Sequence, residues 1–138
     1  MPEMAPGIVL DTNIVLDLLV FKDPLTEPLR AALASGQVRW IGTAAMRDEL
    51  ERVLAYPQIA KRLDFYALQA QAVLATRDAL VHTVLVADKA PVTCKDPDDQ
   101  RFIDLAVAHR CAVLSKDHAV LCMAKRLLAL GAHARCAM

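Results

Sequence analysis

Four acidic residues lie where the sequence predicts the ends of strands or the inner faces of helices. Asp11 and Asp117 each end a short apolar run and open a helical pattern, whereas Glu49 and Asp99 lie within helical patterns. Four carboxylates gathered in one place would repel one another strongly unless a cation compensated them. Ligands that are all oxygens suit Mg²⁺ or Mn²⁺ rather than zinc. Such a site would support phosphodiester hydrolysis, in which a bound metal activates water and neutralises the phosphate.

Helical spacing directs two of these carboxylates inward. Glu49 lies on or beside the apolar stripe that includes Met46 and Leu50. Asp99 precedes Phe102 by three residues and shares its helix face. A carboxylate on a core-facing stripe is costly unless it is paired or bound to metal. We therefore expect both side chains at one edge of a sheet, beside the other two acids.

Each acid also has a simpler explanation. Asp11 and Asp117 could cap the helices that follow them, as Asp commonly does. Glu49 could lie at the edge of its stripe and reach water, and Asp99 could favour its helix dipole as the third residue. The adjacent Asp98 and Asp99 leave open which of the two is the ligand, and the shared helix face favours Asp99. The coincidence of four acids at one sheet edge is what favours a metal site.

Motifs of other chemistries do not occur. We find no Gly-x-Ser-x-Gly turn, no Gly-x-x-x-x-Gly-Lys phosphate loop and no His-Glu-x-x-His pair. The histidines are scattered, so a paired-histidine mechanism is not expected; they are His82, His109, His118 and His133. The cysteines form no Cys-x-x-Cys pair, and we expect them to be buried free thiols; they are Cys94, Cys111, Cys122 and Cys136.

The elements that must position the acids alternate between strand and helix. Thr43 and the pair Asp96-Pro97 are helix starts, and Pro57 stops the helix before it. Predicted strands cover 7–10, 38–41, 80–86 and 112–114, with a short run near 133–137; predicted helices cover 43–54, 59–77, 96–109 and 118–130, with helical spacing also between 16 and 33. This alternation predicts a mostly parallel sheet with helices on both faces. Ligands of such sheets bind beyond the carboxyl ends of the strands.

The composition fits one domain. The chain of 138 residues is 56% hydrophobic and contains no linker or repeat. No apolar run is long enough to cross a membrane, and the N-terminus lacks the pattern of a signal peptide, so we expect a cytoplasmic protein. The 16 basic residues balance the 16 acidic ones. If four acids bind metal, the remaining surface carries an excess of four positive charges that a nucleic acid could use.

Four motifs follow one another along the chain. They are Val9-Leu10-Asp11-Thr12-Asn13, then Arg47-Asp48-Glu49-Leu50-Glu51-Arg52-Val53-Leu54 followed by Pro57, then Asp96-Pro97-Asp98-Asp99 with Phe102 and Ala106, and finally Leu114-Ser115-Lys116-Asp117. In this order they resemble the PIN domain family, and in particular its bacterial branch of VapC-like toxins from toxin–antitoxin systems. The likeness spans nearly the whole chain and implies a single PIN-like nuclease domain over residues 1–138. It also implies a three-layer, Rossmann-like α/β/α sandwich with a central, mainly parallel sheet.

The resemblance further implies a function. The family cleaves single-stranded RNA with Mg²⁺ or Mn²⁺, which implies an endoribonuclease. The catalytic, metal-binding residues would be Asp11, Glu49, Asp99 and Asp117, with Asn13 and Ser115 as supporting polar groups. The family often has threonine where Ser115 stands, and the hydroxyl is kept. Family members frequently form homodimers, and a toxin of this kind is neutralised by an antitoxin whose tail occupies the active-site groove.

Other interpretations stay open. Three basic residues flank the acids and are candidate substrate contacts, with ordinary surface charge as the alternative; they are Lys95, Arg101 and Lys116. A PIN fold could act as a binding or regulatory protein with little or no nuclease activity. A phosphohydrolase of the haloacid dehalogenase type usually has a second Asp where Asn13 stands here. A receiver-like signalling domain needs a phosphoacceptor after a middle strand, which neither Glu49 nor Asp99 supplies.

Overall fold

A parallel sheet forms the centre of the molecule. The computed structural model describes residues 5–138. Its strands lie in the order β3-β2-β1-β4-β5, and each neighbouring pair is parallel. Their bounds are β1 Gly7–Leu10, β2 Arg39–Gly42, β3 His82–Thr83, β4 Ala112–Leu114 and β5 His133–Arg135. β1 is the middle strand, with Ile8 aligned with Trp40 of β2 on one side and with Ala112 of β4 on the other.

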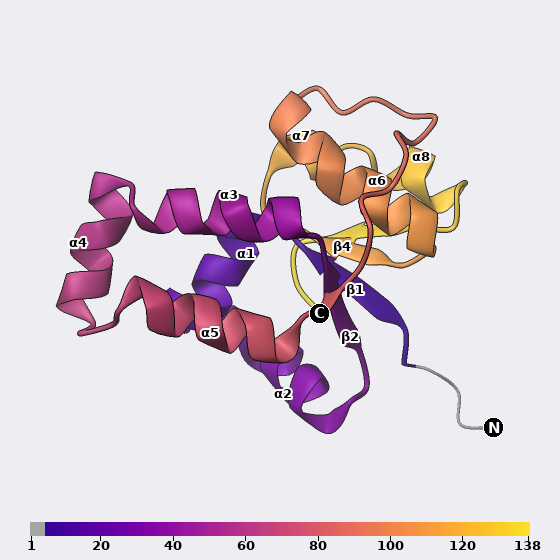
Figure 1. Ribbon diagram of the computed structural model, residues 1–138. Coiled ribbons are helices and arrows are strands. Elements are labelled where there is room, and N and C mark those ends of the chain that lie inside the picture. The colour runs from indigo at the N-terminus through magenta and orange to yellow at the C-terminus, as the bar shows by residue number, and fades with distance from the viewer. Residues whose placement is uncertain (1–4) are drawn as a thin grey trace.

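Helices cover both faces of this sheet (Figure 1). One face carries α1 Thr12–Leu16, α2 Glu27–Ser35, α3 Ala44–Leu54, α4 Pro57–Phe65 and α5 Ala70–Leu80, together with the π-helical η1 Asp17–Phe21 and the 3₁₀ turn η2 Pro24–Thr26. The other carries the 3₁₀ turn η3 Pro97–Asp99, α6 Gln100–His109, α7 His118–Leu121 and α8 Ala124–Leu128. The predicted three-layer α/β/α sandwich with a mainly parallel sheet is confirmed. Among residues 5–138, no helix is long and apolar enough to cross a membrane.

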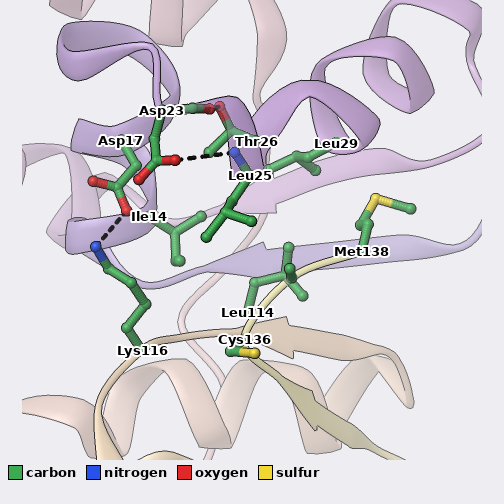
Figure 2. A pocket seen from close by; sticks show the side chains of 11 residues that line it. Ile14, Asp17, Asp23, Leu25, Thr26, Leu29, Leu114, Lys116, Cys136 and Met138 are labelled. Carbon is green, nitrogen blue, oxygen red and sulfur yellow. Dashed lines mark hydrogen bonds and ion pairs between the residues drawn. The ribbon is translucent and has the colours of Figure 1, made fainter.

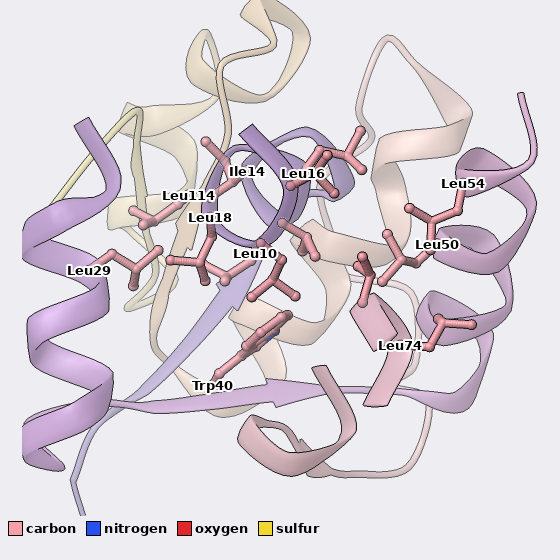
Figure 3. Close-up of a cluster of buried hydrophobic side chains, with 14 of the residues drawn as sticks. Leu10, Ile14, Leu16, Leu18, Leu29, Trp40, Leu50, Leu54, Leu74 and Leu114 are labelled. Atoms are coloured by element: carbon pink, nitrogen blue, oxygen red, sulfur yellow. The ribbon is translucent and has the colours of Figure 1, made fainter. Parts of the chain in front are cut away.

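The alternation of side chains along the strands builds a core on each face. Ile8 and Leu10 of β1 belong to the first core, whereas Val9 between them belongs to the second. Figure 3 shows the first core, in which leucines from several helices surround Trp40. Because helices cover both faces of the sheet, every inner position of β1 has to be apolar. The first polar residue, Asp11, therefore falls where the strand ends.

Two predicted helices are each broken in the structure. The helix predicted over 59–77 is instead the pair α4 and α5, because Ala67 between them adopts a left-handed φ of 55°. The helix predicted over 118–130 is interrupted at Met123, whose ψ of 3° leaves the helical region. Met123 is buried in the second core. Burial of Met123 thus accompanies the second break, whereas the first lies at the exposed Ala67. Helical spacing alone predicted neither break.

The strand predicted over 80–86 is reduced to the two residues of β3. The helix α5 continues to Leu80, where the strand was expected to begin. Beyond β3, the N–H of Val84 still donates to the carbonyl of Gly42 at 2.9 Å. The next two residues, Leu85 and Val86, are exposed. The apolar and β-branched residues of this run predicted a longer strand, but the strand at this edge of the sheet ends after β3.

The expectation of buried thiols is confirmed for only two of the four cysteines. All four are free, with Cys94 and Cys111 buried but Cys122 and Cys136 exposed. Burial raises the pKa of the Cys111 thiol to about 11. Cys111 is therefore protonated at neutral pH and behaves as a small apolar side chain.

Candidate metal centre

The carboxyl ends of β1 and β4 lie side by side at the centre of the sheet. From β1 the strand order runs to β2 and β3 in one direction and to β4 and β5 in the other. The connections diverge between β1 and β4, which creates the crevice where open α/β sheets bind ligands. Asp11 directly follows β1, and Asp117 follows β4 after two intervening residues. Both strand-end acids therefore lie at this crevice.

A hydrogen-bonded hydroxyl holds Asp11 in place. Asp11 Oδ2 accepts a 2.6 Å hydrogen bond from the Ser115 hydroxyl, which in turn accepts one of 3.0 Å from the N–H of Asp117. Asp11 Oδ1 accepts from the N–H of Asn13 at 3.4 Å, so Asp11 does cap its helix. Burial raises the pKa of Asp11, although the bond from Ser115 acts in the opposite direction. Helix capping therefore holds the Asp11 carboxylate at the crevice, and it is compatible with a role for Asp11 in a metal site there.

Asp99 is the least compensated carboxylate in this region. It is 7% exposed, and its Oδ2 is buried without a hydrogen-bond partner in the part of the chain that the structure describes. Burial, followed by the hydrogen bond to Asp117 and repulsion from Asp11, raises the pKa of Asp99 to about 8. The N–H of Ala119 at 2.9 Å, followed by the bond from Asp99, lowers the pKa of Asp117. Without a cation, the pair therefore shares one proton, which resides on Asp99 at neutral pH.

Asp96 joins this cluster, although its sequence context predicts only a helix cap. Asp96 does cap, because its Oδ1 accepts from the N–H of Asp98 at 3.0 Å. One carboxylate oxygen from each of Asp96, Asp99 and Asp117 lies within 4.8 Å of the others. The spacing of three residues between Asp96 and Asp99 was a signal for two acids on one helix face. Because helix capping alone explains an aspartate at this position, no second role for Asp96 was predicted.

Glu49 faces the same region from α3 but lies outside the three-carboxylate cluster. Its side chain is 20% exposed, between the predicted inward position and the water-exposed alternative. Glu49 Oε2 accepts a 3.0 Å hydrogen bond from the Thr12 hydroxyl, and Arg101 Nη1 lies 3.9 Å from the same oxygen. The Arg101 side chain is also partly exposed, so this ion pair is weak. Thr12 therefore positions Glu49 without neutralising it.

The carboxylates line one groove of about 360 Å³. The lining consists of Asp11, Thr12, Asn13, Leu16, Glu49, Val53, Tyr56, Gln58, Ile59, Asp96, Asp99, Phe102 and Asp117. All four predicted acids are present, together with Asp96 and the predicted supporting residue Asn13. No lysine or arginine occurs among these lining residues. The groove thus combines an acidic wall with a wall of apolar and uncharged side chains.

The three basic residues flanking the acids in sequence do not line this groove. Lys116 forms a 2.6 Å ion pair with the buried Asp17 in a separate small pocket (Figure 2). Lys95 is exposed. Arg101 touches the groove indirectly, through its contact with Glu49. Of these three, Arg101 is the one that forms an ion pair with a predicted metal-binding acid among the described residues.

The donor set fits a divalent cation. Three neighbouring carboxylates supply oxygen ligands, and the unpartnered Asp99 Oδ2 is a buried polar atom that a cation would satisfy. Oxygen-only ligands suit Mg²⁺ or Mn²⁺. Ser115 on Asp11 and Thr12 on Glu49 are the kind of outer hydrogen-bond donors that orient metal-binding carboxylates.

Comparison with known proteins gave one finding. A family model described as PIN domain matches residues 7–119, which is well over half of the chain. No curated protein and no solved structure matches the chain. The matched range contains each of the five groove carboxylates.

Proposed function

The chain belongs to the PIN domain family, and on this premise we propose that it is an endoribonuclease that uses Mg²⁺ or Mn²⁺ to cleave single-stranded RNA. Family membership supports a nuclease-type function, and the acidic groove supports metal dependence. Asp11, Glu49, Asp99 and Asp117 are the proposed metal-binding residues, and Asp96 is added to them from the structure.

The unpartnered oxygen of Asp99 is the observation that carries this proposal. A buried polar atom without a partner is costly, and native proteins rarely retain one without a functional reason. Neighbouring carboxylates aggravate the cost through repulsion. A divalent cation would satisfy the oxygen, displace the shared proton and relieve the repulsion at once. No side chain of the groove offers an equivalent positive charge.

The side chains have separate roles in this mechanism. Asp96, Asp99 and Asp117 would hold the cation directly, and it would supply activation of water and neutralisation of the scissile phosphate. Ser115 fixes the orientation of Asp11, and Thr12 fixes that of Glu49. Glu49 approaches from the opposite helix layer, where it can accept a proton from the attacking water or add a ligand oxygen. Asn13 presents an exposed amide at the groove for a phosphate oxygen.

The physiological role we propose is that of the toxin in a toxin–antitoxin pair acting on cytoplasmic RNA. The four sequence motifs resemble that branch of the family. An antitoxin tail that occupies the groove and a homodimer are the partners this role predicts. The alternative is a binding or regulatory PIN protein with little nuclease activity, and the observation in its favour is the absence of lysine and arginine among the groove residues.

A matched pair of aspartate variants tests the proposed activity. Asp99→Asn removes the unpartnered carboxylate, whereas Asp98→Asn changes its exposed neighbour on the same turn. Labelled single-stranded RNA is incubated with each protein in Mn²⁺, Mg²⁺ or EDTA. We expect cleavage by the wild type and by Asp98→Asn, lost in EDTA and in Asp99→Asn. Equal cleavage by both variants contradicts the proposed site, and no cleavage by the wild type favours the binding protein.

A further inference from the structure

One wall of the groove is apolar and aromatic. Val53, Tyr56 and Ile59 line it, with Gln58 beside them. Val53 and Ile59 are partly buried and pack against the first core, so they form a firm surface. Tyr56 is 49% exposed. A large aromatic ring that is half exposed within a groove is available to a ligand.

This wall continues directly from the proposed metal site. Glu49 and Val53 are one helical turn apart on α3, and Tyr56 follows three residues later, as the chain leaves that helix. The helix ends at Leu54, and Tyr56 lies beyond it in an extended conformation with a ψ of 138°. The side chains of all three residues nevertheless line the same groove. The groove therefore contains both carboxylates and an aromatic ring.

The polar atoms of this wall are free for a ligand. Within the described chain, the hydroxyl of Tyr56 and the side-chain amide of Gln58 form no hydrogen bond to another residue, whereas Tyr66 accepts one from Arg62. Tyr56 is the N-cap residue before α4, and its N–H donates to the carbonyl of Val53 at 3.0 Å. The backbone position is thus fixed while the ring and the amide beside it remain unengaged.

The absence of basic side chains in the lining limits how a nucleic acid could bind. Most single-strand binders combine basic residues for the phosphates with aromatic residues for the bases. No lysine or arginine lines this groove, so phosphates away from the metal find no counter-charge there. Stacking of a base on an aromatic ring needs no counter-charge. It is therefore the contact that this wall can supply.

We propose that Tyr56 is the platform on which an unpaired base of the RNA substrate stacks, with Ile59 beneath that base and the Gln58 amide at its edge. This inference rests on the proposed ribonuclease function. It assigns single-strand selectivity to a particular side chain, because a base in a duplex is already stacked and has to be extruded before it can reach Tyr56. It also predicts tolerance of base identity, since every base has a face that can stack.

Binding measurements test the platform without requiring cleavage. Tyr56→Ala, Tyr56→Phe and the control Phe65→Ala are made in a Glu49→Gln background that is expected not to cut. Phe65 is an 81% exposed aromatic residue of α4 that does not line the groove. Fluorescence anisotropy with Mn²⁺ and labelled single-stranded RNA should show affinity reduced roughly 5- to 150-fold in Tyr56→Ala. Tyr56→Phe and Phe65→Ala should stay within about twofold of the background, because a stacking ring is retained at residue 56.

Cleavage kinetics with abasic substrates separate stacking from a structural role. Single nucleotides beside the cleaved bond are made abasic in turn. In the otherwise wild-type protein, one such position should lower kcat/KM, and the same position should have no effect in Tyr56→Ala, because the two changes remove the same contact. An equal loss in both proteins overturns the platform and indicates general damage.

The outcomes distinguish this inference from the proposed function. If the wild type cleaves RNA but Tyr56→Ala binds it as well as Phe65→Ala does, the platform is overturned while the nuclease stands. If the wild type neither cleaves nor binds RNA, both proposals are overturned.

Discussion

Two edges of this molecule place an aspartate in opposite electrostatic surroundings. The Asp78 carboxylate on α5 forms ion pairs with Arg47 Nε at 3.0 Å and with Arg77 Nη1 at 3.1 Å. These arginines lower the pKa of Asp78. Asp99 at the other edge has carboxylates as neighbours, and its pKa is raised to about 8. The first group finds its counter-charge within the chain. The second lacks one, which is the basis for our proposal that a cation supplies its counter-charge.

One helix, α3, contributes a side chain to each of these two regions. Arg47 points to α5, whereas Glu49 two residues later points to the acidic groove. Neighbouring charged residues thus serve different purposes, because adjacent positions of a helix face different directions. Charge alone does not mark a functional residue; the lack of compensation does.

The largest expected difference between the two edges is in RNA cleavage. Asp117→Asn removes a proposed metal-binding carboxylate, and we expect activity to fall at least about 100-fold. Asp78→Asn removes a compensated carboxylate away from the groove, and cleavage should stay close to that of the wild type. Initial rates with saturating Mn²⁺ measure both. Comparable losses in the two variants would remove the distinction between the edges.

Thermal unfolding with Mn²⁺ should separate the same variants by a smaller amount. A cation that binds only the folded protein adds about 2.7 kcal/mol at 100 times its dissociation constant. The wild type and Asp78→Asn should both gain melting temperature in millimolar Mn²⁺, and Asp117→Asn should gain little. A wild-type melting temperature that does not move with Mn²⁺ contradicts a metal site at the groove.

The raised pKa of Asp99 predicts a pH dependence of the metal-free protein. The ordinary pKa of 3.8 applies when the chain is unfolded, and the folded value is about 8. Between these values the folded state binds more protons than the unfolded state, so this group makes stability fall as pH rises. Denaturant melts in EDTA at pH 6 and pH 8 should show a larger fall for the wild type than for Asp99→Asn. Parallel pH profiles of the two proteins contradict the uncompensated state of Asp99.

The smallest expected effect is on the compensated side. Asp78 and Arg47 are substantially exposed, so their ion pair is screened by solvent. Asp78→Asn should lower the melting temperature by only about 1–4 °C at neutral pH, and by less in high salt. Because the pKa of Asp78 is lowered, its contribution is present above pH 3.8 and is lost as pH falls further. A fall as large as that expected for a buried network would show that solvent does not screen this pair.

The strands at the site were predictable because a change from apolar to polar residues marks their ends. The runs 7–10 and 112–114 are apolar, have to be buried on both faces, and end near the first acid or hydroxyl. The run 80–86 is also rich in apolar and β-branched residues, yet most of it is not strand, since pairing at a sheet edge depends on whether the neighbour continues. Sequence thus predicts a buried strand better than an edge strand.

The site was predictable in part for similar reasons. Asp11 and Asp117 follow from strand ends, but the ion pair between Lys116 and Asp17 depends on the π-helical turn after α1, which no pattern indicated. Asp96 was not predicted as a site residue, because its role as a helix cap already explained its presence. Tyr56 carries no local signal, because its place in the groove depends on where α4 begins. What the sequence did not reveal is which side chains meet across elements.

The Ser115 hydroxyl sets a condition on when this protein can become active during its synthesis. It links Asp11 to a partner 104 residues further along the chain. A ribosome that has completed only the first three strands has therefore made neither the donor that orients Asp11 nor the acids of the second helix layer. A truncated or stalled product carries an incomplete groove. An enzyme that attacks RNA would thus be kept inactive while its own messenger RNA is still being read.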